Sequence, residues 1–404
     1  MEKVLCNQTM TYRTMPSTGD QISLLGYGCM RFRKKGKVID EKRAERQVRI
    51  AIKKGVNYFD TAYLYPGNEE VLGRILEKGL RDQIYLATKL PHLLIHSRAD
   101  FDLIFQIQLE RLKTNYIDYY LIHSLSSIND WEKLKEKGFL DFLQKKREQN
   151  SLHHLGFSYH GNSRDFMKII DDYPWEFCQI QYNYLDEFSQ AGRIGLEYAS
   201  EKGIGVIIME PLRGGLLGAK MPNYAWKMLK GTGIEPATLA LRFSWEHQGV
   251  QVVLSGMNEE MHIDENCSTA KKYGNIQLGD QELSVIKTVK ELFQQKEKVS
   301  CTACSYCMPC PFGVDIPTCF SCYNSYSIKK RFMTIMRYYI TTEGKNFGKP
   351  SRASLCKSCG ACEKKCPQGI DIRKHLEDTV LVLEKASFRI PLLLYMKLLR
   401  FRKK

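Results

Sequence analysis

The chain has 404 residues, enough for two or three domains, and its content of 43% hydrophobic and 26% charged residues argues against intrinsic disorder. No apolar run approaches the roughly 20 residues of a membrane-spanning helix, and the first residues lack the apolar core of a secretory signal. The formal net charge of +15 favours an anionic partner. Because this charge is spread and no nucleic-acid-binding motif occurs, we expect no nucleic acid partner. Because we find no export signal, we expect a cytoplasmic location.

From about residue 20 to residue 298, short apolar runs alternate with amphipathic segments. The runs predict eight β-strands, at residues 22–28, 56–60, 84–89, 117–123, 153–158, 177–183, 205–210 and 250–256. Helical patterns lie between them, at residues 41–54, 69–78, 100–113, 130–149, 163–171, 187–202 and 236–247. Asp40 and Asp100 are the expected N-caps of the first and third helices, and Gly55, Gly138 and Gly203 stand where helices can end.

The alternation of strands and helices predicts parallel βαβ units, which can form either an open sheet or a closed barrel. An open doubly wound sheet would need a glycine-rich phosphate loop after its first strand. The chain has Gly26 and Gly28 there, but Arg31 replaces the third glycine of that motif. Eight strands over about 280 residues fit a (β/α)₈ TIM barrel better. We therefore predict an α/β fold of this kind.

Ten of the 14 cysteines lie between Cys301 and Cys366. Disulfides would be reduced in a cytosol, so clustered cysteines there indicate metal ligands. They form two runs, CTACSYCMPCP and CKSCGACEKKCP. The second has the C-x₂-C-x₂-C-x₃-C-P spacing of bacterial ferredoxins, whereas the first has two residues before its last cysteine. The cysteines of the runs are Cys301, Cys304, Cys307 and Cys310, then Cys356, Cys359, Cys362 and Cys366.

Three thiolates at this spacing can hold one face of an iron–sulfur cubane, and the fourth ligand comes from the other run. This predicts two [4Fe–4S] clusters in a small α-helical ferredoxin-like domain. One would be held by Cys301, Cys304, Cys307 and Cys366. The other would be held by Cys356, Cys359, Cys362 and Cys310. A pair of structural zinc sites is the alternative, but four cysteines in each tight run, ending in Cys-Pro, disfavour it.

The remaining C-terminal segments predict helices. Residues 327–340, between the runs, have the pattern of an amphipathic helix, and Cys319 and Cys322 before them are expected to be spare thiols, with a redox or ligand role as the alternative. Residues 376–404 predict an amphipathic helix with a basic end, either a solvated helix end or a contact with a membrane surface or an acidic protein. We thus predict a barrel at 1–298, a ferredoxin-like domain at 299–375 and this tail.

In a parallel barrel, functional residues gather at the C-terminal ends of the strands. Asp60, Lys89, His123 and Glu210 end predicted strands, and Tyr65 follows Asp60 by five residues. An ammonium near a tyrosine lowers the pKa of the phenol, a carboxylate can hold that ammonium, and a histidine can hydrogen-bond a substrate oxygen. Asp60, Tyr65, Lys89 and His123 therefore predict a proton-delivery site beside a carbonyl.

Each of these residues taken alone has a structural interpretation, because polar residues at strand ends are common. Tyr63 is a rival for Tyr65, Tyr58 is a candidate core residue, and His123 could be a structural histidine.

The segment GVNYFDTAYLYPGNEEVLGRIL, followed by LATK and LIHS, resembles the aldo-keto reductase family over roughly residues 20–290. With the cysteine runs, nearly the whole chain resembles its iron–sulfur subgroup. The resemblance implies a (β/α)₈ barrel that reduces carbonyls with a nicotinamide cofactor. In it Tyr65 is the general acid, Lys89 lowers its pKa, Asp60 pairs with Lys89, and His123 orients the carbonyl. The cofactor would lie along Ser158, Gln179, Met209, Glu210, Pro211, Leu212, Gly214, Ser255, Gly256, Glu265 and Asn266.

The chain departs from the family pattern at two places. Tyr159 and His160 follow Ser158, where the family commonly has asparagine. The expected adenosine-phosphate loop, LSGMNEEMHIDEN, offers only His262 as a basic residue and carries the acidic Glu259 and Glu260. A 2′-phosphate calls for arginine or lysine, so NADH and NADPH both stay open. The diphosphate could use backbone N–H groups near Gly214 and Gly215, with a plain tight turn as the alternative.

Hydride transfer moves two electrons at once, whereas a cubane cluster accepts one at a time. A nicotinamide therefore needs a group such as a flavin, which separates the electron pair into single electrons, to reduce a cluster. We predict an oxidoreductase that interconverts a small-molecule carbonyl and alcohol with NAD(P)H, or with a flavin, and exchanges electrons through its clusters. An acidic carrier such as ferredoxin or flavodoxin would suit the basic surface. The alternatives are a reductase with purely structural clusters, and an electron carrier or sensor built on a barrel that no longer catalyses.

Overall fold

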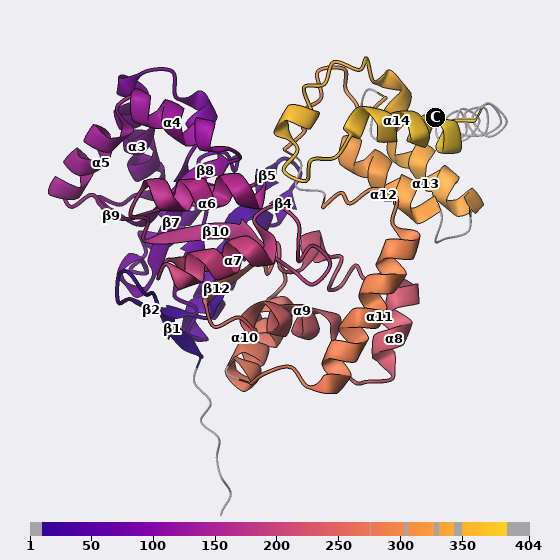
Figure 1. The fold of residues 1–404 in the computed structure, drawn as a ribbon, viewed down its shortest axis with the longest axis horizontal. Helices are drawn as coiled ribbons and strands as arrows, with labels where there is room; N and C mark the ends of the chain where they lie inside the picture. Colours follow the sequence, from indigo (N-terminus) through magenta and orange to yellow (C-terminus); the bar gives the residue numbers. More distant parts are fainter. Residues whose placement is uncertain (1–9, 275, 303–305, 327–330, 343–349, 386–404) are drawn as a thin grey trace, which may run out of the picture. The chain divides into compact units, whose positions relative to one another are not determined.

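The structure is a computed structural model that describes residues 10–274, 276–302, 306–326, 331–342 and 350–385. The chain divides into two compact units, residues 1–287 and 288–404 (Figure 1). The division falls within helix α11 (Asp280–Lys296), about ten residues before the boundary predicted at residue 298.

Eight parallel strands of the first unit close into a barrel, in the order β10-β11-β12-β3-β6-β7-β8-β9. Each of the eight predicted strands corresponds to one of them, so the (β/α)₈ prediction is confirmed and the open sheet is excluded. The strands are β3 (Leu25–Gly28), β6 (Tyr58–Asp60), β7 (Tyr85–Leu90), β8 (Ile117–Leu125), β9 (Leu152–Tyr159), β10 (Phe177–Gln181), β11 (Gly205–Met209) and β12 (Val250–Ser255).

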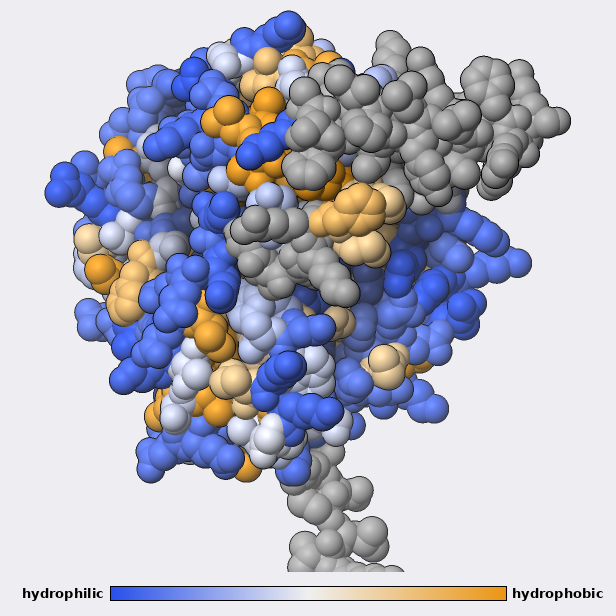
Figure 2. Space-filling view, turned by 90° about the vertical axis from the view of Figure 1, so that its right-hand side faces the viewer, coloured by the Kyte–Doolittle hydropathy of each residue, from blue (hydrophilic) through white to orange (hydrophobic). Residues whose placement is uncertain are grey.

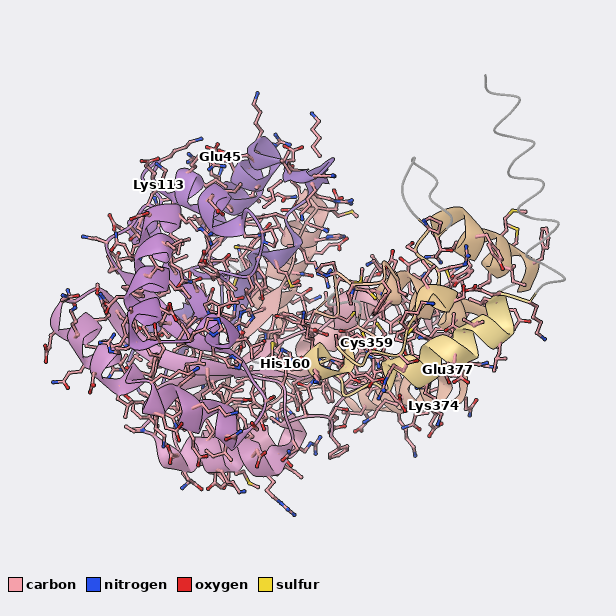
Figure 3. All side chains as sticks on the ribbon, turned by 90° about the horizontal axis from the view of Figure 1, so that it is seen from above. Glu45, Lys113, His160, Cys359, Lys374 and Glu377 are labelled. Atoms are coloured by element: carbon pink, nitrogen blue, oxygen red, sulfur yellow. The ribbon has the colours of Figure 1, made fainter. Side chains whose placement is uncertain are left out.

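Helices surround this barrel, and charged side chains such as Glu45 and Lys113 project from their outer surface (Figure 3). The helices before α11 are α1 (Glu41–Lys53), α2 (Asn68–Leu76), α3 (Arg98–Leu112), α4 (Ile128–Glu136), α5 (Phe139–Glu148), α6 (Ser163–Asp172), α7 (Gly192–Glu201), α8 (Asn223–Lys230), α9 (Pro236–Trp245) and α10 (Glu260–Tyr273).

Two details of the helices differ from the sequence prediction. The single helix predicted at 130–149 is two helices, because Gly138 adopts a left-handed conformation with φ of 83° between α4 and α5. Asp40 is the N-cap of α1 as expected, but Asp100 is not an N-cap. Ser97 caps α3, and the Asp100 carboxylate accepts a hydrogen bond from the Ser97 backbone N–H at 2.7 Å, which completes a capping box.

A short N-terminal hairpin, β1 (Tyr12–Thr14) and β2 (Gln21–Ser23), was not predicted and closes one end of the barrel. Its Met15 and Ile22 are buried among the side chains that fill the barrel. Met15 packs against Gly205, the first residue of β11, where any side chain would collide with the Met15 sulfur. The N-terminal end of the barrel is therefore packed with side chains, and the strand-end residues lie at the other end. A second small pair, β4 (Lys34–Lys35) and β5 (Val38–Ile39), follows β3.

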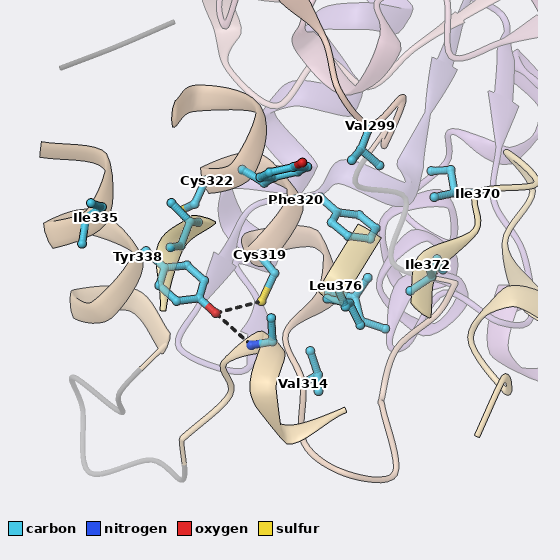
Figure 4. Close-up of a cluster of buried hydrophobic side chains, with 14 of the residues drawn as sticks. Val299, Val314, Cys319, Phe320, Cys322, Ile335, Tyr338, Ile370, Ile372 and Leu376 are labelled. Carbon is cyan, nitrogen blue, oxygen red and sulfur yellow. Dashed lines mark hydrogen bonds between the residues drawn. The ribbon is translucent and has the colours of Figure 1, made fainter. Parts of the chain in front are cut away.

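The second unit is built from helices α12 (Ile316–Tyr326), α13 (Arg331–Thr342) and α14 (Ile372–Leu383), with short 3₁₀ turns at Ala353–Leu355 and Glu363–Lys365. Its core gathers side chains of all three helices, including those of Cys319 and Cys322 (Figure 4). Helix α13 corresponds to the amphipathic helix predicted at 327–340. The predicted tail begins within α14, and its residues 386–404 lie outside the described residues.

None of the helices in the described part of the chain combines the length and the apolar character needed to cross a membrane. On the face shown in Figure 2, hydrophilic residues predominate and hydrophobic ones occur in small groups.

Candidate active site and metal centre

A buried ion pair lies at the C-terminal ends of two neighbouring strands. Lys89 near the end of β7 donates hydrogen bonds to both carboxylate oxygens of Asp60, the last residue of β6, at 2.6 Å each. The same ammonium donates to the backbone oxygen of Thr61 at 2.8 Å, and the amide of Gln179 donates to Asp60 at 3.0 Å. The side chains of Lys89 and Asp60 are only 1% and 6% exposed. An unpaired charge at such a place would be costly, so each residue fixes the other.

Tyr65, rather than its rival Tyr63, lies beside this pair. The Lys89 ammonium is 5.4 Å from the centre of the Tyr65 ring, and that ring meets the imidazole of His123 edge to face at 5.9 Å. The Tyr63 ring instead lies 4.5 Å from the guanidinium of Arg111, and Tyr58 is part of the barrel core. The structure thus brings together Asp60, Tyr65, Lys89 and His123, the four residues chosen from the sequence.

Two neutral imidazoles lie near this site. Burial, reinforced by the positive charge of Lys89, holds the pKa of His123 well below its usual range. Burial also lowers the pKa of His160, the residue after β9, to about 4, and its Nδ1 lies 3.1 Å from the amide oxygen of Gln190. A neutral imidazole can donate a hydrogen bond to a carbonyl oxygen and leave the proton transfer itself to another group.

A polar network that the sequence analysis missed holds β7 from outside the barrel. The carboxylate of Glu69 on α2 accepts hydrogen bonds from Thr88 at 2.6 Å and from the amide of Gln108 on α3 at 2.8 Å. The same amide donates to the backbone oxygen of Lys89 at 3.1 Å. Burial raises the pKa of Glu69. The signal in the sequence was a polar residue on the buried face of each helix, which the helical pattern alone does not single out.

The expected cofactor residues lie in the next four barrel strands or in the segments that follow them, with Glu265 and Asn266 on α10. The Ser158 hydroxyl accepts a hydrogen bond from the backbone N–H of Ser124 at 2.7 Å, and Gln179 is paired in register with Ser158. The Ser255 hydroxyl accepts from the side chain of Asn266 at 3.0 Å, and Gly256 follows β12 directly. Glu265, in contrast, is exposed on α10.

The loop after β11 has an unusual backbone. Glu210 and Arg213 have positive φ angles of 55° and 45°, and Gly214 and Gly215 follow with 64° and 93°. Strained non-glycine residues cluster at ligand-binding sites. Pro211 and Leu212 complete the turn, in which the Leu212 carbonyl accepts the N–H of Gly215 at 2.8 Å.

Arg213 in this loop was not singled out from the sequence. Its side chain is 3% exposed and lies 3.0 Å from the Asp186 carboxylate. From Asp186, amide hydrogen bonds continue through Gln181 at 3.2 Å and Gln190 at 2.8 Å to His160 at 3.1 Å. A chain of hydrogen bonds therefore connects the loop after β11 with the imidazole after β9.

The acidic residues at the start of α10 form ion pairs with basic residues from elsewhere in the chain. Glu259 forms ion pairs with both Arg33 and Arg43, and Glu260 pairs with Arg46 at 3.4 Å. The loop itself lacks arginine, as the sequence indicated, but two guanidinium groups converge there and are engaged by the protein's own carboxylate.

The first predicted cluster site coincides with a pocket of the second unit. Cys301, Cys307 and Cys366, three of its four predicted ligands, line this pocket, and Cys304 lies outside the described residues. The thiols are accompanied by apolar side chains, among them Ile316 and Phe320. A thiol-lined apolar pocket fits an iron–sulfur cluster. Among the described residues, no three metal-ligating side chains are already assembled around one point.

The predicted ligands of the second cluster are more accessible. Cys310, Cys356 and Cys362 are partly buried, and Cys359 is exposed (Figure 3). Cys319 and Cys322 are buried in the core instead, and burial raises the pKa of the Cys319 thiol. A thiol kept protonated in this way is a poor metal ligand, which agrees with the interpretation of a spare thiol.

The lowered pKa of His160 makes the stability of the fold depend on pH. The folded chain keeps His160 neutral down to about pH 4, whereas a histidine of the unfolded chain binds a proton near pH 6.5. Stability is therefore lost as the pH falls from about 6.5 to 4. We expect His160→Asn to flatten the decrease in unfolding temperature across this interval, and the exposed-site control His96→Asn to leave it unchanged. Equal pH dependence in all three proteins would contradict the assignment.

Comparison with known proteins agrees with the fold and with the division into a barrel and a cysteine-rich C-terminal part. The model of the aldo/keto reductase family matches residues 24–291, and that of the 4Fe-4S dicluster domain matches residues 300–371. L-galactose dehydrogenase of Arabidopsis thaliana is 25% identical over 308 residues, 69% of this chain and 94% of the relative. The uncharacterized oxidoreductase YrpG of Bacillus subtilis (strain 168) is 27% identical over 237 residues, 52% of this chain and 69% of the relative.

A solved structure supports the fold alone. The aldo-keto reductase AKR11C1 from Bacillus halodurans, in its holo form, superposes with a TM-score of 0.58 at 24% identity and covers 69% of this chain and 96% of its own. With the family model matched over most of the barrel, the chain belongs to the aldo/keto reductase family and is an oxidoreductase with a C-terminal 4Fe-4S dicluster domain.

Proposed function

We propose that this protein reduces a small-molecule carbonyl with a nicotinamide dinucleotide at the C-terminal end of the barrel. The observation that carries the proposal is the buried Lys89–Asp60 pair with Tyr65 beside it and a neutral His123 against the Tyr65 ring. The arrangement combines a proton donor, a fixed positive charge and a neutral hydrogen-bond donor, which are the groups that carbonyl reduction requires.

Bound nicotinamide would supply the hydride, and the chain's own residues would manage the charge that develops on the carbonyl oxygen. Tyr65 donates its phenolic proton to that oxygen. The Lys89 ammonium, held by Asp60, stabilises the phenolate that Tyr65 becomes. His123 stays neutral and orients the carbonyl oxygen by a hydrogen bond. Because the Lys89–Asp60 pair is buried, water screens its field little, and the pair acts on the phenol more strongly than an exposed pair would.

The Tyr65 hydroxyl is the decisive atom of this proposal. We expect Tyr65→Phe to lower kcat for carbonyl reduction by about 100-fold or more, since general acid catalysis typically contributes that much. Iron content and nucleotide affinity should stay at the parental level. Tyr63→Phe deletes the same atom from a ring two residues away and should retain activity. Steady-state kinetics on anaerobic protein check both variants, and retained turnover in Tyr65→Phe would exclude it as the acid.

The loop after β11 is the best candidate for binding the dinucleotide's diphosphate. Arg213, Gly214 and Gly215 have a left-handed backbone, of the kind that lets a ligand approach the chain closely, and the buried Arg213 adds a positive charge. The ion pairs of Glu259 favour NADH over NADPH. A 2′-phosphate placed near the start of α10 would meet the Glu259 carboxylate and compete with it for Arg33 and Arg43.

Removing this carboxylate should shift the cofactor preference. In Glu259→Gln the two arginines lose their anionic partner, and we expect kcat/KM with NADPH to rise about tenfold relative to NADH, an effect of roughly 1.4 kcal/mol. Glu260→Gln, at the neighbouring position, is the matched control and should change the ratio little. A preference for NADPH in the parent protein would refute this assignment.

We assign two [4Fe–4S] clusters to the C-terminal unit with crossed ligation, and electron exchange with an acidic carrier protein as their role. The pocket lined by Cys301, Cys307 and Cys366 supports the crossing, because Cys366 comes from the other cysteine run. The basic charge of the chain supports an acidic partner such as ferredoxin or flavodoxin, which it would attract over a distance.

Two cysteine variants separate crossed from uncrossed ligation. Crossed ligation predicts that Cys366→Ala removes the first cluster and Cys359→Ala the second, so the double variant should lose nearly all iron and sulfide. If Cys366 instead ligated the cluster of its own run, the double variant would keep one cluster, about half of the parental iron. Iron and sulfide analysis after anaerobic purification distinguishes the two outcomes, and Cys322→Ala, in the core, should keep both clusters.

A further inference from the structure

The segment just before the second cysteine run, residues 351–355, is held by helices that contribute no predicted ligand. The backbone N–H of Asp315, at the start of α12, donates to the Ser351 oxygen at 2.8 Å. The backbone N–H of Ser351 donates to Thr342, at the end of α13, at 2.7 Å. Helices α12 and α13 belong to the stretch between the two cysteine runs, so this stretch does more than space the runs apart.

A buried tyrosine adds a side-chain contact to the same segment. The hydroxyl of Tyr338 on α13 accepts a hydrogen bond from the backbone N–H of Ala353 at 2.8 Å and lies 3.9 Å from the Cys319 sulfur (Figure 4). It donates in turn to the carboxylate of Glu384, the residue after α14, at 2.5 Å. Burial raises the pKa of Tyr338, so the hydroxyl stays a donor.

The carboxylate of Glu384 returns to that segment. It accepts the backbone N–H of Ser354, two residues before Cys356, at 3.0 Å, and Arg352 approaches it at 3.6 Å. The residue is only 8% exposed. Burying a carboxylate is costly, and an apolar side chain would pack this core at lower cost. The Glu384 carboxylate thus contacts Tyr338 and two residues of the segment before Cys356.

We propose that Tyr338 and Glu384 are positioning residues of the second [4Fe–4S] cluster, which hold the segment before Cys356 and place a negative charge beside the cluster. The inference rests on the ligand assignment proposed above. Reduction makes a thiolate-bound cluster more negative, so a fixed carboxylate nearby lowers its reduction potential. Glu384 is not among the residues that line the pocket of the first cluster, where apolar side chains surround the thiols. We therefore expect its charge to act on the second cluster.

Charge and position can be tested separately on anaerobic full-length protein. Glu384→Gln keeps an oxygen that accepts the same hydrogen bonds but removes the charge. In redox titrations followed by electron paramagnetic resonance, it should raise the potential of the second cluster and leave the first unchanged. Tyr338→Phe should speed the loss of the second cluster's iron to a chelator several-fold. Tyr339→Phe, the same deletion at the adjacent buried position of α13, should not.

The signal that Cys359→Ala removes identifies the second cluster. If Cys359→Ala removes no signal, the ligand assignment fails and this inference falls with it. If it removes one signal but Glu384→Gln leaves that cluster's potential unchanged, the inference alone is overturned. The same holds if Tyr338→Phe releases iron from both clusters at equally increased rates, because a general loss of core stability would then explain the release.

Discussion

The ion pair between Lys89 and Asp60 is the constraint on which the candidate active site depends. A buried ammonium is stable only if its counter-charge is held as firmly as itself, and three parts of the barrel meet that requirement. Asp60 is held by Gln179 from β10, the ammonium also binds the Thr61 carbonyl, and the Lys89 backbone is held by Gln108 from α3. The ammonium of Lys89, the charge that we propose acts in catalysis, thus has its position fixed by contacts on both sides of its strand.

The segment between β6 and α2 explains why Tyr65 lies beside the Lys89 ammonium. The chain leaves β6 at Asp60 and enters α2 at Asn68, whose N–H donates to the Tyr65 carbonyl at 3.0 Å. The next residue of α2, Glu69, belongs to the network that fixes Thr88 and Lys89. One short segment therefore carries the Asp60 carboxylate, the Tyr65 phenol and the Glu69 carboxylate that supports β7. The position of the proposed acid is thus coupled to the position of the charge beside it.

The strand-end residues could be predicted because the order of strands and the common direction of a parallel barrel already place them together. Contacts between distant segments could not be predicted in this way. Arg33 and Arg43 reach Glu259 from 226 and 216 residues away, and no local pattern connects them. The hairpin β1–β2 has strands of three residues, too short for an alternating pattern. Gly138 was correctly seen as a helix end, but the amphipathic pattern continued across it and concealed the second helix.

The departure at Tyr159 and His160 shows how a local change can be absorbed by the fold. Tyr159 is buried, and its hydroxyl donates to the Asn162 carbonyl at 2.7 Å, so it ties the end of β9 to the start of α6. His160 then takes the polar role at the strand end and is connected by amide groups to Asp186 and Arg213. Asparagine could not fill the buried site of an aromatic ring and also begin this chain of hydrogen bonds. The change therefore alters both the packing at the end of β9 and the polarity of the residue that follows it, and it connects the imidazole of His160 to the loop after β11.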